Sequence, residues 1–159
     1  MRVFFDSSAF AKRYLEEAGS ETVLGWCDKA TEIVLSGIAL PEIISALCRL
    51  RREGRLKESR YRQLKGLLMA DIADIAICDL TPAVMAETLA SLENGPLRAM
   101  DAIHIGSAVA LKVEVFVTGD KRQADAARGA GLKVELAWRW FLAGSSLPIA
   151  ASSRDACRP

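Results

Sequence analysis

The chain has 159 residues and a mass of 17.2 kDa, which is the size of one domain. Hydrophobic residues make up 51% of it and charged residues 26%, a balance that excludes a disordered or collagen-like chain. Its 21 basic and 20 acidic residues leave a net charge of +1, which excludes a uniformly basic nucleic-acid coat but not a local basic patch.

The first half of the chain alternates short apolar runs with amphipathic segments. Val3-Phe4-Phe5 predicts a buried strand that ends at Asp6, and residues 32–36 predict a second strand. Gly, Ser and Pro mark helix starts between these strands, and apolar residues then recur at helical spacing. The helices expected here cover residues 9–16, 19–27, 41–54 (with Pro41 at the first helical position) and 58–71.

The second half continues the same alternation. Its predicted elements are a strand over 75–80, a helix over 81–92, a break at 93–96, a helix over 100–112, a strand over 115–117, a helix over 121–128 and a strand over 132–136. Continuous apolar strands that alternate with helices are typical of a parallel sheet covered on both faces. We therefore expect a three-layer α/β/α sandwich around a central, mostly parallel sheet of about four or five strands.

Residues 1–142 are predicted to form this single domain, and residues 143–159, rich in Ala, Ser and Gly, a loose C-terminal tail. No secretory apolar region precedes Asp6, and the longest uncharged stretch, 140–153, is too short to span a bilayer. The four cysteines have no CxxC spacing, and the chain has a single His, so a zinc site is not indicated. We expect a soluble cytoplasmic protein without a membrane partner.

Four acidic residues stand where a parallel α/β sheet gathers its functional groups, just beyond the strand ends. Asp6 ends the first strand, and Asp120 follows the 115–117 strand. Glu42 and Asp101 lie in the first turns of their predicted helices. Each acid taken alone has an ordinary interpretation, as a helix cap, a complement to the helix dipole or a solvated turn. Their occurrence at one edge of the sheet favours a shared site.

Four ionised carboxylates in one pocket repel each other, so they require a cation or must take up protons. Ligand sets made only of oxygen suit Mg²⁺ or Mn²⁺ rather than zinc. One or two such ions can activate a water and neutralise the charge on a phosphodiester during an in-line displacement. The residues themselves therefore indicate metal-dependent hydrolysis of a phosphodiester.

Four segments around these acids resemble the PIN domain family, and most of all its VapC branch, the toxins of bacterial type II toxin–antitoxin pairs. The resemblance spans residues 1 to about 140 and is carried by the segments 3–9 (Val-Phe-Phe-Asp-Ser-Ser-Ala), 40–43 (Leu-Pro-Glu-Ile), 98–104 (Arg-Ala-Met-Asp-Ala-Ile-His) and 116–122 (Phe-Val-Thr-Gly-Asp-Lys-Arg). It implies a Mg²⁺- or Mn²⁺-dependent endoribonuclease, with RNA as substrate, a cognate antitoxin protein as partner and a homodimer as assembly.

The resemblance also assigns roles to individual residues. It implies that the catalytic and metal-binding residues are Asp6, Glu42, Asp101 and Asp120. Ser8 and Thr118 match hydroxyl positions that would orient a carboxylate or a water on the metal. Some relatives carry one more acid after the fourth, and Asp125 is the residue of this chain nearest that place.

Two further features have a functional and an ordinary interpretation. Residues 49–65 hold eight basic and two acidic residues, a local charge of +6, either a solvated helix face or an RNA-binding patch. Arg49 and Arg52 share a helical stripe with Glu42, so we expect them to contact RNA. His104 lies three residues after Asp101 and is expected to be a hydrogen-bonded core histidine rather than a metal ligand.

Two rival functions remain to be weighed against the nuclease. A phosphoacceptor receiver domain would need paired acids early in the chain, whereas the next acid after Asp6 is Glu16. A catalytically silent PIN-like module that binds RNA or protein is harder to separate from a nuclease. The four intact acids favour the nuclease, because a silent site has no reason to keep carboxylates that repel each other.

Overall fold

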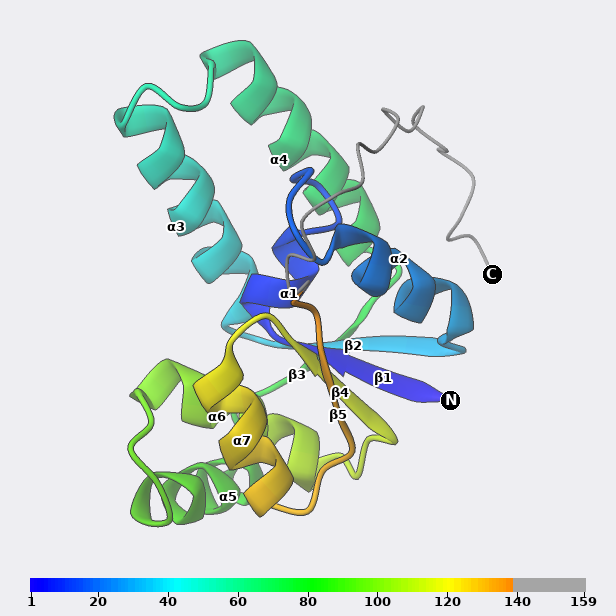
Figure 1. Ribbon diagram of the computed structural model, residues 1–159, viewed down its shortest axis with the longest axis vertical. Coiled ribbons are helices and arrows are strands. Elements are labelled where there is room, and N and C mark those ends of the chain that lie inside the picture. The colour runs from blue at the N-terminus through cyan, green and yellow to red at the C-terminus, as the bar shows by residue number, and fades with distance from the viewer. Residues whose placement is uncertain (139–159) are drawn as a thin grey trace, which may run out of the picture.

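A single parallel sheet forms the centre of the molecule (Figure 1). The computed structural model describes residues 1–138, which contain five strands paired in the order β3-β2-β1-β4-β5. The strands are β1 (Arg2–Phe5), β2 (Glu32–Ser36), β3 (Ala76–Cys78), β4 (Val115–Thr118) and β5 (Val134–Leu136). Every neighbouring pair is parallel, which confirms the predicted sheet.

Seven helices cover the two faces of this sheet within the same residues (Figure 1). They are α1 (Ser7–Ala11), α2 (Ser20–Lys29), α3 (Ala39–Arg52), α4 (Glu58–Ile72), α5 (Pro82–Glu93), α6 (Ala99–Ala110) and α7 (Lys121–Gly129). α1 to α4 pack on one face and α5 to α7 on the other, and α3 and α4 extend away from the sheet side by side. The predicted three-layer α/β/α fold is therefore confirmed.

β1 lies in the middle of the sheet because both of its faces are apolar. Val3 and Phe5 join the core under α1 to α4, whereas Phe4 points to the opposite core and stacks on Phe116 at 5.5 Å between ring centroids. All four side chains are fully buried. The alternation of side chains along a strand thus lets one short segment fill both cores. It also fixes the position of Asp6, the residue that follows Phe5.

α6 packs closely on α5, and this packing fixes the position of α6. A Cβ atom at Gly106 would lie 2.3 Å from Thr88 Oγ1 and 2.8 Å from the carbonyl oxygen of Val84. Only glycine allows the two backbones to approach so closely. The first turn of α6, which carries Asp101, is therefore held on a rigid support.

The helix predicted over 9–16 is wrong in its bounds, since α1 spans Ser7–Ala11. Asp6 begins it early, because its side chain accepts a hydrogen bond from the backbone N–H of Ala9 and so caps the helix. The helix ends early because the N–H groups of residues 12–14 bond to carbonyls three residues back, which tightens the turn.

The other predicted elements are present, with ends that differ by at most two residues. Strands 75–80 and 132–136 shorten to β3 and β5, and Pro41 is the third residue of its helix rather than the first. No helix within residues 1–138 is long and apolar enough to cross a bilayer. The predicted tail, 143–159, and the last residues of the predicted domain lie outside the described residues.

Candidate metal centre

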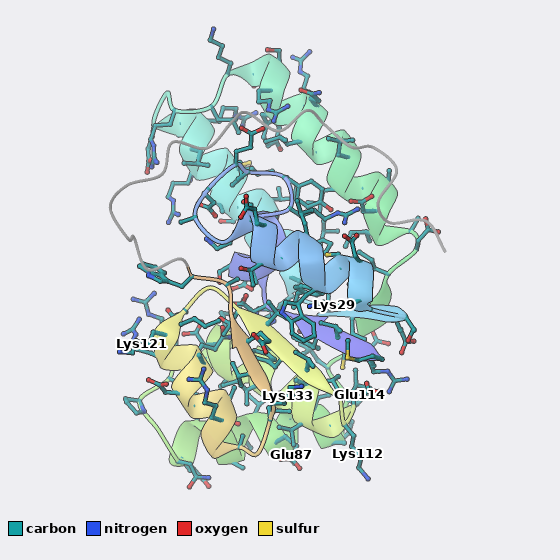
Figure 2. All side chains as sticks on the ribbon, turned by 45° about the vertical axis from the view of Figure 1, so that its right-hand side comes forward. Lys29, Glu87, Lys112, Glu114, Lys121 and Lys133 are labelled. Atoms are coloured by element: carbon teal, nitrogen blue, oxygen red, sulfur yellow. The ribbon has the colours of Figure 1, made fainter. Side chains whose placement is uncertain are left out.

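The carboxyl ends of β1, β2 and β4 meet at one end of the sheet. Lys121, the first residue of α7, marks this end, and Lys112 and Glu114 mark the turn before β4 at the opposite end (Figure 2). α1 and α7 begin directly at it, and the first turns of α3 and α6 also lie there. The chain therefore brings one acidic residue from each of four helix starts to one region.

Asp6 is buried between β1 and β4, with only 4% of its surface exposed. Its Oδ1 accepts from the backbone N–H of Ala9 at 2.7 Å, and its Oδ2 accepts from Ser8 Oγ at 2.8 Å and Thr118 Oγ1 at 3.0 Å. Burial away from water raises the pKa of the Asp6 carboxyl above its usual value. Both hydroxyls expected to orient a carboxylate thus contact this one.

Glu42, in the first turn of α3, is held by α1 and α6. Its Oε2 accepts hydrogen bonds from Ser7 Oγ and from His104 Nε2, the latter at 2.7 Å. Burial acts to raise the pKa of Glu42, but the hydrogen bonds from His104 and Ser7 outweigh it and lower the pKa below its usual value. The carboxylate is therefore kept in its charged form by neighbours on two other helices.

Asp101 lies in the first turn of α6, where the charge of Asp120 at the start of α7 acts on it. Burial, followed by the negative charge of Asp120, raises the pKa of the Asp101 carboxyl. Asp120 caps α7, where its Oδ1 accepts from the N–H groups of Arg122 at 2.7 Å and Gln123 at 3.2 Å. The Gln123 amide in turn donates to the Asp101 carbonyl at 3.2 Å and ties the two helix starts together.

Three of the four predicted acids line one pocket of about 360 Å³, namely Asp6, Glu42 and Asp101. Ser8 and His104 also line it, whereas Asp120 lies beside it and Asp125 does not take part. Asp125 is exposed on α7 and pairs with Arg128 at 2.9 Å. The structure thus gathers three of the predicted carboxylates and places the fourth close enough to act on Asp101 electrostatically.

The donor chemistry of this pocket fits Mg²⁺ or Mn²⁺, because carboxylate oxygens are the ligands that these ions prefer. Burial away from water is the main cause of the raised pKa values of Asp6 and Asp101. Within residues 1–138, however, no three His, Cys, Asp or Glu side chains stand close enough together to hold a metal ion. The pocket is thus an acidic site whose side chains are engaged in hydrogen bonds.

A second pocket, of about 240 Å³, adjoins the first along α3. The residues that line it are Glu42, Ser45, Ala46, Arg49 and Arg52. The helical stripe read from the sequence therefore faces one hollow. The other arginines of the basic stretch are mostly engaged: Arg51 and Arg62 pair with Glu58, and Arg55 pairs with Glu53.

Sequence reasoning missed the roles of Ser7, His104 and Gln123. His104 is buried and hydrogen-bonded, as expected, but its partners are Glu42 and Ser7 of the acidic pocket rather than a remote core group. Its spacing of three residues from Asp101 was the available signal. Gln123 carried no signal, because its contact with the Asp101 carbonyl depends on how α6 and α7 pack.

Comparison with known proteins agrees with this architecture. The profile of one protein family, the PIN domain, matches residues 3–129. Among curated proteins, none has a sequence that matches the chain. Similar solved structures include VapBC2 from Rickettsia felis, bound to a DNA fragment from its promoter, at 15% identity and a TM-score of 0.63, covering 86% of this chain and 98% of that one.

Two further structures are similar at the same level. FitAcB from Neisseria gonorrhoeae has 17% identity and a TM-score of 0.64, over 87% of this chain and 99% of that one. VapC20 from Mycobacterium tuberculosis, a sarcin-ricin loop cleaving toxin, has 16% identity and a TM-score of 0.60, over 78% and 94%. Such identities show a shared fold. Because the family profile runs from the first strand to the last helix, the chain belongs to the PIN domain family.

Proposed function

We propose that this chain is a divalent-metal-dependent endoribonuclease that acts as the toxin of a type II toxin–antitoxin pair. The observation that carries the proposal is the shared pocket of Asp6, Glu42 and Asp101, three carboxylates that come from separate parts of the chain. Two of them have raised pKa values, and a bound cation would lower these pKa values again towards the usual range. Membership of the PIN domain family supports the same chemistry.

Asp6, Asp101 and Asp120 are the proposed metal ligands, with Glu42 as a further ligand or as the group that orients water. When bound, Mg²⁺ or Mn²⁺ supplies Lewis acidity, which lowers the pKa of water and neutralises phosphate charge. The chain's own part is to hold the ligands. The hydroxyls of Ser8 and Thr118 hold both oxygens of Asp6, so its carboxylate cannot rotate freely.

RNA is the proposed substrate, bound along α3. Arg49 and Arg52 line the pocket that adjoins Glu42, where they can hold phosphates next to the acidic site. The fold is shared with VapC20, a sarcin-ricin loop cleaving toxin, which supports a cleaving role for this chain as well.

The proposed protein partner is a cognate antitoxin. The similar structures from Rickettsia felis and Salmonella typhimurium are VapBC assemblies, and FitAB is a further relative in fold. These neighbours support a partner of the same kind for this chain. The homodimer implied by the resemblance belongs to the same proposal, and light scattering of the purified chain measures it.

One observation favours a second candidate, a catalytically silent PIN-like module that binds RNA or protein. Within residues 1–138 no three potential ligands are close enough together to hold a metal ion as they stand. Such a module would bind RNA without cutting it in the presence of Mg²⁺ or Mn²⁺.

RNA cleavage by the wild type separates the two candidates, and RNA cleavage by an Asp6→Asn variant tests the assignment of the site. We expect the wild type to cut RNA in Mg²⁺ or Mn²⁺ and to stop when the metal is chelated, and Asp6→Asn to abolish cutting without unfolding the chain. Asp28→Asn, which changes an exposed acid on α2, should cut as the wild type does. Cleavage by Asp6→Asn at the wild-type rate would refute the assignment, and binding without cleavage by the wild type would favour the silent module.

A further inference from the structure

His104 is a buried polar side chain of α6 that lines the acidic pocket. Only 2% of its surface is exposed, and its ring packs edge-on against Phe4, with centroids 6.1 Å apart. Nε2 lies 2.7 Å from Glu42 Oε2 and 3.0 Å from Ser7 Oγ. The packing fixes the ring, and so it fixes the place from which Nε2 can donate.

The direction of these hydrogen bonds follows from the chemistry of the partners. An ionised carboxylate only accepts, so Nε2 must carry the hydrogen that it shares with Glu42. Nδ1 is buried and has no hydrogen-bond partner within the part of the chain that the structure describes. Nε2 is therefore the atom through which the ring donates to the Glu42 carboxylate.

These hydrogen bonds have a consequence for the carboxylate. Ser7 and His104 both bond to Oε2, and no group within residues 1–138 bonds to Oε1. The two donors come from α1 and α6, so they fix the orientation of a side chain carried by α3. Both donors favour the ionised form of the carboxylate, which is the form that binds a cation.

We propose that His104 is a positioning residue, which together with Ser7 holds the carboxylate of Glu42 in place for a divalent cation. This inference rests on the proposed function, because it assumes that the acidic pocket binds a metal ion. The general reason is that groups that hydrogen-bond to a ligating carboxylate orient it and thereby strengthen metal binding.

Mn²⁺ binding to the full-length chain, measured by electron paramagnetic resonance without RNA, tests this role directly. Gln at position 104 places an amide N–H close to the position of imidazole Nε2, whereas Asn is one methylene shorter. We expect His104→Asn to weaken Mn²⁺ binding about 10- to 100-fold, and His104→Gln to restore most of the affinity. Ser107→Ala, which removes a buried hydroxyl of α6 outside the pocket, should bind Mn²⁺ as the wild type does.

Ser7→Ala provides a second variant, since it removes the hydroxyl donor to Glu42 and keeps the imidazole of His104. It should weaken Mn²⁺ binding in the same direction, at an unchanged circular dichroism spectrum. The inference is overturned if Ser7→Ala binds Mn²⁺ as tightly as the wild type does and His104→Gln binds it no better than His104→Asn. Weaker binding by Glu42→Gln would then show that the metal site itself stands. Absence of Mn²⁺ binding by the wild type would overturn the proposed function together with this inference.

Discussion

Replacing Arg49 and Arg52 with alanine tests whether α3 leads RNA phosphates towards Glu42. Both arginines are exposed and line the pocket of about 240 Å³ that Glu42 shares. Neither forms an ion pair with another described residue. A cation without a carboxylate partner can neutralise a phosphate and release the counterion that was bound to it. The double variant should therefore lose affinity for RNA in a salt-dependent manner.

The expected magnitude follows from the number of contacts. Each phosphate contact with a single strand contributes about 0.7 to the slope of log K against log salt concentration. Loss of two contacts should lower the slope by about 1.4. When the salt concentration rises fourfold, from about 50 to about 200 mM, the parent should lose about sevenfold more of its RNA affinity than the double variant does.

A second double variant provides a control of matched charge. Arg55 and Arg62 are 71% and 76% exposed, but they pair with Glu53 and Glu58. Replacing both with alanine removes the same two charges without removing an unpaired cation, so the slope should stay close to that of the parent. Fluorescence anisotropy of a short labelled RNA measures the slope, in an Asp6→Asn background that prevents cleavage. Equal slopes for the two double variants would refute the assignment of RNA binding to α3.

Two further predictions concern the stability of the chain without metal. Burial raises the pKa of Asp6 in the folded state, so the cost of its ionisation is absent in strong acid and grows as the pH rises towards that pKa. Because Asn caps a helix as well as Asp does, Asp6→Asn should raise the thermal midpoint at neutral pH and lose this gain in acid, and a gain independent of pH would contradict the cause. Gly106→Ala should lower the free energy of unfolding in urea by about 1–3 kcal/mol, because the new Cβ meets α5. Gly66→Ala, where a Cβ meets nothing within 4 Å, should raise it by about 0.5–1 kcal/mol, and equal effects would count against the close packing.

The sheet could be predicted from the sequence because its strands are continuous apolar runs that end at polar residues. The strand predicted over 32–36 is β2, and the short run after Met1 is the central strand β1. The helix over 9–16 failed because its bounds depend on a side-chain cap at Asp6 and on tightened hydrogen bonds after Ala11. Apolar periodicity does not report either feature.

The candidate site divides in the same way between local and long-range information. Strand ends and helix starts were sufficient to select Asp6, Glu42 and Asp101, which line one pocket. The helical spacing of Arg49 from Glu42 was sufficient to place both on one stripe. The hydrogen bond from His104 joins residues 62 positions apart, and it depends on which faces of α3 and α6 meet. Spacing within one helix cannot supply that information.

The hydrogen-bond partners of Asp71, a carboxylate outside the candidate site, bear on the choice between nuclease and silent module. Asp71, at the end of α4, accepts hydrogen bonds from the Arg13 guanidinium at 2.9 Å and from the Tyr14 hydroxyl at 2.8 Å, so its charge is compensated by a cation. The donors that reach Asp6 and Glu42 are hydroxyls, a backbone N–H and the imidazole of His104, and no arginine or lysine within residues 1–138 forms an ion pair with either carboxylate. These donors orient the two carboxylates, while burial raises the pKa of Asp6. A module that only binds RNA gains nothing from buried negative charge that repels phosphates, whereas a metal-dependent nuclease needs it to attract the cation.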